Sequence, residues 1–215
     1  MHFDTVLFDL DGTLTDSAEG ILNTLLYALD KFNCHPDRAE LYRFIGPPLT
    51  ECFDEYIGPG NSAKGVEVYR ERYAKLGLYE STVYDGVPQM LAAVKGAGLT
   101  VALSTSKPEK YAKMILEKFG LLQYFDIVAG ARLDGTLQTK SEVIELALSR
   151  IPNPDRQKTV IVGDRLHDME GAETCGIGRI AALWGFGSYE ELSAYKPLLL
   201  AKTPAEVAQY LTTSH

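Results

Sequence analysis

Two aspartates near the start of the chain could do chemistry together. Asp9 and Asp11 follow an apolar, β-forming run (residues 3–8) and precede Gly12 and Thr13. We expect the run to be a buried strand, and open α/β sheets bind ligands at the carboxyl ends of such strands. In extended backbone both carboxylates would point to one side, where they repel unless a cation or a shared proton offsets them. The alternative is an ordinary Asp-Gly turn.

A second polar segment, residues 104–109, ends the apolar run of residues 99–103. We expect Pro108 in the first turn of a helix, with Ser106 and Glu109 forming a capping box. A helix N-terminus offers unpaired amide groups and the positive end of the helix dipole, so it is a ready phosphate site. A helix start without any ligand would explain the same residues.

Lys140 stands at the start of another predicted helix. Thr139 and Glu142 can form a capping box that places Lys140 in the first turn. A lysine is unfavourable there, because this end of the dipole prefers anions, and such local conflicts are expected at functional sites. The conflict disappears if the ammonium group faces Asp9 and a phosphate. The alternative is a solvated surface lysine.

An acidic pair follows the buried run of residues 160–162. Asp164 comes directly after Gly163, and Asp168 lies four residues later, within reach if the chain turns helical. Carboxylate oxygens suit Mg²⁺, which keeps several waters and a near-octahedral geometry. These two carboxylates are therefore of a type that such an ion could use. His167, alone between acids, is expected to be a surface histidine.

Taken in order, these segments resemble the motifs of the haloacid-dehalogenase-like phosphohydrolases, along essentially the whole chain. The resemblance implies that Asp9 is the nucleophile and that Asp11 is the general acid/base. It also implies that a hydroxyl in the second segment hydrogen-bonds the transferring phosphoryl group. The Thr-Ser-Lys-Pro sequence is similar to the phosphoglycolate-phosphatase form of this motif and indicates Thr105, with Ser104 as the fallback.

The same resemblance implies a catalytic role for Lys140, although the family usually continues with Pro-x-Pro and this chain has Ser-Glu-Val. It further implies Mg²⁺ held by Asp9, by the backbone carbonyl of Asp11 and by Asp164. Asp168 is then a direct or water-bridged ligand.

The stretch from residue 16 to 84 has apolar residues at helical spacing and no evident buried strand. We expect helices over residues 21–32, 39–44, 49–56 and 66–76, with a loop at 59–62. The resemblance implies that this insert is a helical cap of the C1 type, which closes over the site and sets specificity.

Three further residues are candidates for substrate binding: Arg43 in the insert, and Ser106 and Lys107 in the second segment. Arg43 could equally be a solvated arginine at a helix end, and Lys107 a solvated lysine. Many relatives have a small polar residue where Arg165 stands, so its role stays open.

Outside the insert, strands and helices alternate. We expect strands at 99–103, 125–129, 159–162 and 180–183, a turn at 134–135, and helices at 87–97, 108–119, 142–150, 169–175 and 204–211. This alternation predicts a parallel sheet with right-handed crossovers. The expected fold class is α/β: a three-layer Rossmann-like parallel-sheet core, residues 1–15 and 85–215, with an all-helical cap, residues 16–84, inserted after the first strand.

Composition excludes several classes of partner. The 215-residue chain has a formal net charge of −8, which argues against general nucleic-acid or anionic-membrane binding. Its three cysteines are widely spaced and match neither a disulfide framework nor a zinc site. We expect reduced thiols, no export signal or membrane span, and a cytoplasmic location. The expected partner is a small phosphorylated metabolite, and the expected state is a monomer or a weak homodimer.

The sequence thus predicts a Mg²⁺-dependent phosphatase that hydrolyses a small phosphate monoester through an aspartyl-phosphate at Asp9, similar to phosphoglycolate phosphatases. Alternatives are a 5′-nucleotidase, a pyrophosphatase or a phosphosugar mutase of the same family, and a non-catalytic phosphate-binding protein on the same fold. A dehalogenase is disfavoured, because it needs neither Asp11 nor a metal.

Overall fold

The computed structural model describes residues 2–133, 137 and 139–213. The chain divides into two compact units, of which the smaller is residues 16–82 and the larger combines residues 1–15 with 83–215. The turn expected at 134–135 lies outside the described residues. Within the described part, no helix has the length and apolar character needed to cross a membrane.

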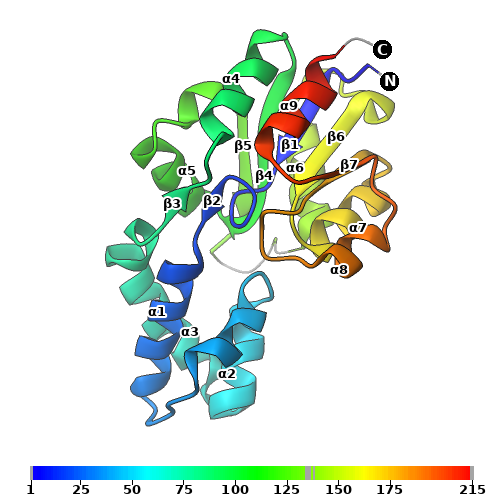
Figure 1. The fold of residues 1–215 in the computed structure, drawn as a ribbon. Coiled ribbons are helices and arrows are strands. Elements are labelled where there is room, and N and C mark those ends of the chain that lie inside the picture. The colour runs from blue at the N-terminus through cyan, green and yellow to red at the C-terminus, as the bar shows by residue number, and fades with distance from the viewer. Residues whose placement is uncertain (1, 134–136, 138, 214–215) are drawn as a thin grey trace. The chain divides into compact units, whose positions relative to one another are not determined.

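Six parallel strands form the sheet of the larger unit, in the order β5-β4-β1-β6-β7-β8 (Figure 1). Their bounds are β1 (Thr5–Phe8), β4 (Thr100–Pro108), β5 (Ile127–Ala131), β6 (Thr159–Gly163), β7 (Gly178–Ala182) and β8 (Leu199–Ala201). The first strand lies inside the sheet, with Leu7 opposite Ala102 of β4 and Ile161 of β6. The parallel pairing confirms the predicted α/β class.

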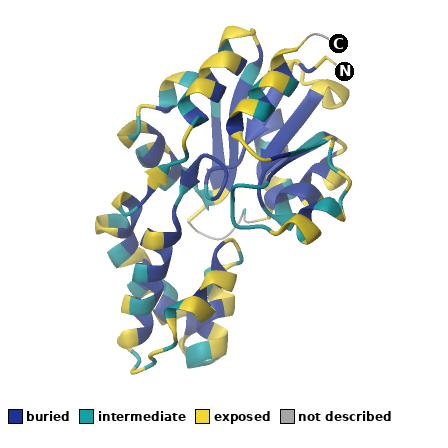
Figure 2. Cartoon of the chain, in the orientation of Figure 1, coloured by how far each residue is buried: buried dark blue, intermediate teal, exposed yellow. Residues whose placement is uncertain are grey.

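Helices cover both faces of this sheet. They are α4 (Val87–Gly96), α5 (Glu109–Lys118), α6 (Lys140–Ser149), α7 (Leu166–Cys175), α8 (Tyr189–Ser193) and α9 (Pro204–Thr212), with 3₁₀ turns η3 (Leu122–Tyr124) and η4 (Arg156–Lys158). Apolar residues of α6 and α7 form one buried cluster with Leu7, Ala102 and Ile161. Right-handed crossovers place α4 and α5 on the opposite face, where α9 packs on α4. The strands are therefore buried from both sides (Figure 2), which explains their continuous apolar runs.

The smaller unit is built mainly of helices. They are α1 (Ala18–Asp30), the 3₁₀ helix η1 (Arg38–Phe44), α2 (Leu49–Ile57), α3 (Pro59–Lys75) and the turn η2 (Gly77–Tyr79). The longest of them, α3, packs against both α1 and α2. Two short strands, β2 (Thr15–Asp16) and β3 (Thr82–Val83), pair with each other where the chain leaves and rejoins the larger unit. The insert therefore has a strand pair at its ends, which the sequence did not indicate.

Two local predictions are wrong. Residues 59–62 are not a loop, because α3 begins at Pro59, a position whose missing N–H costs a helix nothing. The capping box of Ser106 and Glu109 does not form either. Strand β4 continues to Pro108, so α5 starts only at Glu109 and has no side-chain cap.

Candidate active site

Three acidic side chains meet where β1 and β6 end. Asp9 directly follows β1, and its N–H extends the ladder by donating to the carbonyl of Val162 at 3.0 Å. Asp164 directly follows β6, and Asp168 lies in the first turn of α7. All three are buried, and one carboxylate oxygen of each lies within 4.8 Å of the others. Neighbouring parallel strands thus bring together residues that are far apart in the sequence.

Lys140 lies against these acids. Thr139 and Glu142 form the predicted capping box, which fixes Lys140 as the first residue of α6. The Nζ atom of Lys140 donates to Asp9 Oδ1 at 2.7 Å and to the carbonyl of Ser104 at 3.1 Å. It also forms an ion pair with Asp168 Oδ1 at 2.7 Å. Because this side chain is 5% exposed, the surface-lysine alternative is wrong.

The Asp164 carboxylate is held on both of its oxygens. Thr13 Oγ1 donates to Oδ1 at 3.0 Å, and the backbone N–H of Phe186 donates to Oδ2 at 2.8 Å. Gly12 makes this approach possible, because a Cβ there would lie 2.1 Å from Oδ2. Its φ of +83° also favours glycine. The Asp-Gly step of the first motif therefore shapes the site as well as turning the chain.

Burial and crowding shift the pKa values of these groups. Burial raises the pKa of Asp9 to about 6, opposed by Lys140 and reinforced by Asp168. Burial also raises the pKa of Asp164 well above its ordinary value, with Asp168 and Asp9 adding to the effect. Burial alone would lower the pKa of Lys140, but the attraction of Asp168 and Asp9 outweighs it and raises that pKa. The ammonium group of Lys140 pairs with Asp9 and Asp168, so the three buried carboxyl groups outnumber the one positive group that contacts them.

This donor set fits a Mg²⁺ ion. Mg²⁺ prefers oxygen ligands and is commonly bound through carboxylates, and Asp9, Asp164 and Asp168 present buried oxygens within a radius that one ion can bridge. In addition, Asp11 Oδ1 is buried without a hydrogen-bond partner among the described residues. A cation here would offset the charge that Lys140 leaves unbalanced.

The second segment supplies polar groups from the end of β4. Thr105 is buried, and its Oγ1 accepts from the N–H of Lys107 at 3.2 Å. Ser104 Oγ is buried without a hydrogen-bond partner among the described residues. Ser106 is exposed. The Nζ atom of Lys107 lies 2.9 Å from Asp11 Oδ2, and its side chain is 7% exposed, so the solvated alternative for Lys107 is wrong.

The side chains of three further residues have partners outside the acidic cluster. Arg43 belongs to the smaller unit, where it pairs with Glu55 and lies over the ring of Phe44, 4.4 Å from the centroid; its substrate role stays a prediction. His167 is 43% exposed, which confirms the expected surface histidine. Arg165, whose role was open, donates from Nε to Glu191 Oε1 at 3.1 Å.

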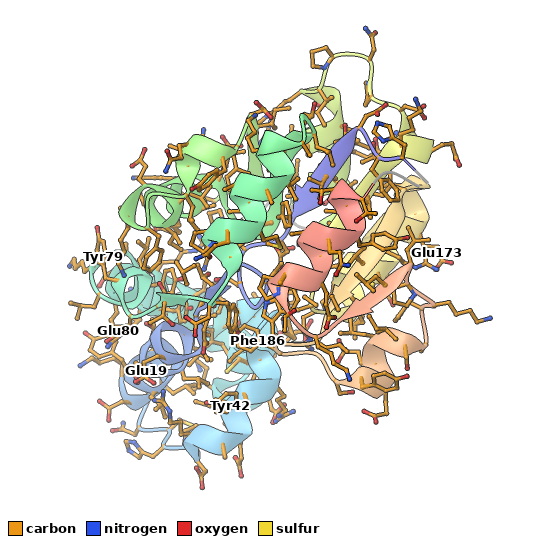
Figure 3. The ribbon with its side chains drawn as sticks, turned by 45° about the horizontal axis from the view of Figure 1, so that its top comes forward. Glu19, Tyr42, Tyr79, Glu80, Glu173 and Phe186 are labelled. Carbon is orange, nitrogen blue, oxygen red and sulfur yellow. The ribbon has the colours of Figure 1, made fainter. Side chains whose placement is uncertain are left out.

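Sequence reasoning missed the segment of residues 184–191. Trp184 Nε1 donates to the carbonyl of Thr13 at 3.0 Å. Phe186, labelled in Figure 3, contributes its backbone N–H to Asp164. A backbone N–H can come from almost any residue type, so the sequence does not indicate it. The available signal was the chain's single tryptophan, beside two glycines after an apolar strand.

Comparison with known proteins identifies the class. The family model described as haloacid dehalogenase-like hydrolase matches residues 6–182, and the chain belongs to this family. Its relatives of known name include several phosphatases, and the chain is accordingly a phosphatase of this family.

Three individual similarities are informative. The chain is 39% identical, over 98% of its length and 96% of the other protein, to a Pseudomonas aeruginosa protein named 5′-nucleotidase. A structure described as a predicted phosphatase from Clostridium acetobutylicum matches with a TM-score of 0.92 and 38% identity, covering 98% of this chain and 99% of that one. A Mycobacterium tuberculosis protein named tyrosine-protein kinase PtkA is 40% identical over 85% of this chain and 62% of its own length. More distant relatives are named phosphoglycolate phosphatase and pyrophosphatase.

Proposed function

We propose that the protein is a Mg²⁺-dependent phosphatase in which Asp9 attacks the phosphorus of a small phosphate monoester and forms an aspartyl-phosphate. One observation carries the proposal: the Asp9 carboxylate is fixed 2.7 Å from the Lys140 ammonium, beside two further buried carboxylates. A nucleophile needs to be ionised and oriented. With a pKa of about 6, Asp9 is mostly ionised at neutral pH, and Lys140 fixes its orientation.

Groups that lie beside Asp9 can offset the negative charge of the transferring phosphoryl group. Transition states of phosphoryl transfer spread negative charge over the equatorial oxygens, and fixed positive groups stabilise it. Lys140 supplies such a group, and Thr105 a hydroxyl that can donate to the same oxygens. Bound Mg²⁺ would add Lewis-acid stabilisation of this charge. Asp9, Asp164 and Asp168 would hold the ion with their carboxylates, and Asp11 with its backbone carbonyl.

Asp11 would act as the general acid and then as the general base. As an acid it gives its proton to the leaving alcohol, and as a base it then takes one from the water that cleaves the aspartyl-phosphate. At rest, Asp11 Oδ2 pairs with Lys107 Nζ at 2.9 Å. Lys107 thus occupies one oxygen of this carboxyl, which leaves Oδ1 for proton transfer to the leaving oxygen.

Nucleoside 5′-monophosphates are the substrate class that we propose first. The Pseudomonas aeruginosa relative named 5′-nucleotidase is 39% identical along almost the whole chain, whereas the relative named phosphoglycolate phosphatase is 29% identical. We further propose that residues 16–82 act as the cap that selects the leaving group, with Arg43 as a contact.

A screen of phosphate esters tests the proposal. Purified protein with Mg²⁺ is offered nucleoside 5′-monophosphates, phosphoglycolate, sugar phosphates, phosphotyrosine and pyrophosphate, and free phosphate is measured with and without EDTA. We expect turnover of at least one monoester that EDTA abolishes. Acid quenching during turnover should leave phosphate on the peptide that contains Asp9. An Asp9→Asn variant with substantial turnover would exclude this mechanism.

A second candidate is transfer of the phosphoryl group to a tyrosine hydroxyl instead of water. The 40% identity to the protein named tyrosine-protein kinase PtkA favours testing it. The two functions share the attack by Asp9 and differ in the acceptor. Incubation with ATP and a tyrosine-containing peptide separates them: a phosphatase releases free phosphate, and a transferase yields phosphopeptide. The same product analysis detects a mutase, which would return an isomerised phosphosugar.

A further inference from the structure

Glu191 joins the segment after β7 to the start of α7. Its Oε1 atom accepts two hydrogen bonds, from the N–H of Leu166 at 2.8 Å and from Arg165 Nε at 3.1 Å. The side chains of Arg165 and Glu191 are 17% and 23% exposed. Both belong to the larger unit, and neither touches Asp9 or Lys140 through any hydrogen bond described above. Arg165 and Glu191 are thus near Asp164 and Asp168, but they are not among the groups that we propose to react.

Two carboxylates accept backbone N–H groups at the start of α7. Leu166 is the first residue of the helix, so its N–H has no acceptor within it, and Arg165 at the N-cap has no side-chain acceptor to offer. Asp168 Oδ2 takes the N–H of Arg165 at 3.1 Å, and Glu191 takes that of Leu166. A carboxylate at a helix N-terminus is also favoured by the helix dipole.

Each of the two carboxylate oxygens of Asp168 thus has its own contact. One oxygen holds the backbone of Arg165, while the other faces Lys140 at 2.7 Å. If the first turn of α7 frays, Asp168 loses its orientation, and the chain between it and Asp164 loosens. Glu191 opposes that fraying without occupying either oxygen of Asp168.

Glu191 is itself fixed by its surroundings. Ser188 Oγ accepts its N–H at 3.1 Å and so starts α8, and Leu192 packs in a buried cluster with Met169 of α7. Just before α8, a Cβ on Gly187 would lie 2.1 Å from the carbonyl oxygen of Asp164. The segment therefore touches the chain of Asp164 closely.

We propose that Glu191 and Arg165 are positioning residues that hold Asp164 and Asp168 in the geometry required for binding a divalent cation. This inference rests on the proposed Mg²⁺ site and extends it to two residues that do not contact the ion. It predicts that breaking the pair weakens cation binding before it affects the binding of substrate. A purely structural role would lower stability and leave the affinity for the cation unchanged.

The test measures cation binding directly. Mn²⁺ is titrated into Glu191→Ala, which has no side-chain acceptor, in the absence of substrate, with free Mn²⁺ followed by electron paramagnetic resonance. We expect the Kd to rise about tenfold, the lower end of the effect of losing a residue that orients metal ligands. The Mg²⁺ concentration for half-maximal activity should rise in parallel, with little change in KM for the phosphate ester. Glu190→Ala, at the neighbouring exposed carboxylate on the same helix, is the matched control and should keep the wild-type Kd.

Two more variants keep the proposal falsifiable. Arg165→Lys keeps the charge, loses the Nε donor and should shift the Kd less than Glu191→Ala. The double variant Glu191→Ala with Arg165→Met should bind Mn²⁺ no more weakly than the worse single variant, since one contact is lost. Unchanged Mn²⁺ affinity in folded Glu191→Ala or Arg165→Met overturns the proposal. If wild-type protein binds Mn²⁺, Glu191→Ala weakens it and no phosphate ester is hydrolysed, the positioning role stands and the proposed function fails.

Discussion

The surface ion pairs of the smaller unit contrast with the buried acidic cluster of the larger unit. In the smaller unit, the ion pairs of lysine and arginine each join one base to one acid at or near the surface. Arg38 pairs with Glu19 at 2.7 Å, and Arg72 pairs with Glu80 at 2.9 Å. Glu80 and Glu19 are labelled in Figure 3. Such pairs contribute modestly to stability and can be exchanged for other surface residues at low cost.

At the ends of β1 and β6 in the larger unit, by contrast, three carboxylates are buried with fewer positive partners than acids. Asp9 and Asp168 share Lys140, and the buried Asp164 beside them forms no ion pair among the described residues. Burial raises the pKa of Asp9 and of Asp164. Such a cluster destabilises the folded state, because the desolvation penalty of the buried carboxylates exceeds the attraction that a single ammonium group provides. The comparison teaches that an unbalanced buried cluster distinguishes the end of the sheet at which we propose the active site. Four predictions break or sharpen this contrast.

The largest effect is expected from Asp9→Asn. Removing the proposed nucleophile should lower kcat by at least about a thousandfold. The metal-free protein should at the same time keep or raise its melting temperature, because one acid leaves a crowded cluster. Glu19→Gln in the smaller unit is the control and should leave kcat near the wild-type value. Steady-state kinetics and thermal melting measure both outcomes, and a large fall in melting temperature for Asp9→Asn would contradict the proposed charge excess.

Lys140→Met should damage both activity and stability. Loss of the ammonium removes stabilisation of the transferring oxygens, for which kcat should fall about 100- to 1,000-fold. Unfolding in urea should show a loss of about 3–5 kcal/mol in the metal-free protein, since breaking a buried ion pair leaves uncompensated acids. Lys64→Met, at a surface pair with Glu67, should change neither measurement. Full stability of Lys140→Met without metal would show that the acids do not need this partner.

The pH dependence of stability should differ in sign between the units. Because burial raises the pKa of Asp9 to about 6, its favourable contribution to folding is present below its ordinary pKa and is lost as pH rises through about 6. The metal-free wild type should therefore lose stability relative to Asp9→Asn between about pH 4 and pH 7. Added Mg²⁺ should stabilise more at neutral than at acidic pH, because the ligands must be deprotonated.

Glu80 supplies the opposite case. Its hydrogen bonds to Arg72 lower its pKa, so its contribution is present above its ordinary pKa and is lost as pH falls through the lowered value. The difference between wild type and Glu80→Gln should then be flat across neutral pH. Urea unfolding at several pH values measures both slopes. Parallel curves for wild type and Asp9→Asn would refute the assigned shift.

The smallest effect is expected from Arg72→Met. Arg72 donates to both oxygens of Glu80, at 2.9 and 3.0 Å, and to Thr24 Oγ1 at 2.8 Å. We expect a loss of about 1 kcal/mol in unfolding free energy, reduced at high salt because exposed charges are screened. Activity should stay near that of the wild type. A loss as large as that of Lys140→Met would remove the distinction between the two units.

Much of the fold could be predicted because it rests on patterns that residue type records. Continuous apolar runs predicted β1, β4 and β6, and the alternation of strands and helices predicted a parallel sheet. Short elements escaped, since β8 spans three residues and α8 five, too few for a period to be visible. The start of α3 was misread because Pro59 and Gly60 suit a turn as well as a first helical turn.

The candidate site was predictable in part for the same reason. Asp9, Asp164 and Lys140 are polar residues at the ends of apolar runs or at a helix start, and topology alone brings such positions together. The pairing of Lys107 with Asp11 was not predictable, because it depends on how a side chain turns after the register shift that follows Thr105. Nor was the contribution of Glu191, which depends on the path of an irregular segment.

The paired strands β2 and β3 have a consequence for how this chain can be altered. The N–H of Tyr84 donates to the carbonyl of Leu14 at 3.2 Å, so the two points between which the insert is spliced are hydrogen-bonded neighbours. A short glycine linker could bridge them, and a replacement module with equally close termini could be grafted there without shifting the register of the sheet. Natural exchange of the helical module by recombination would meet the same low geometric barrier.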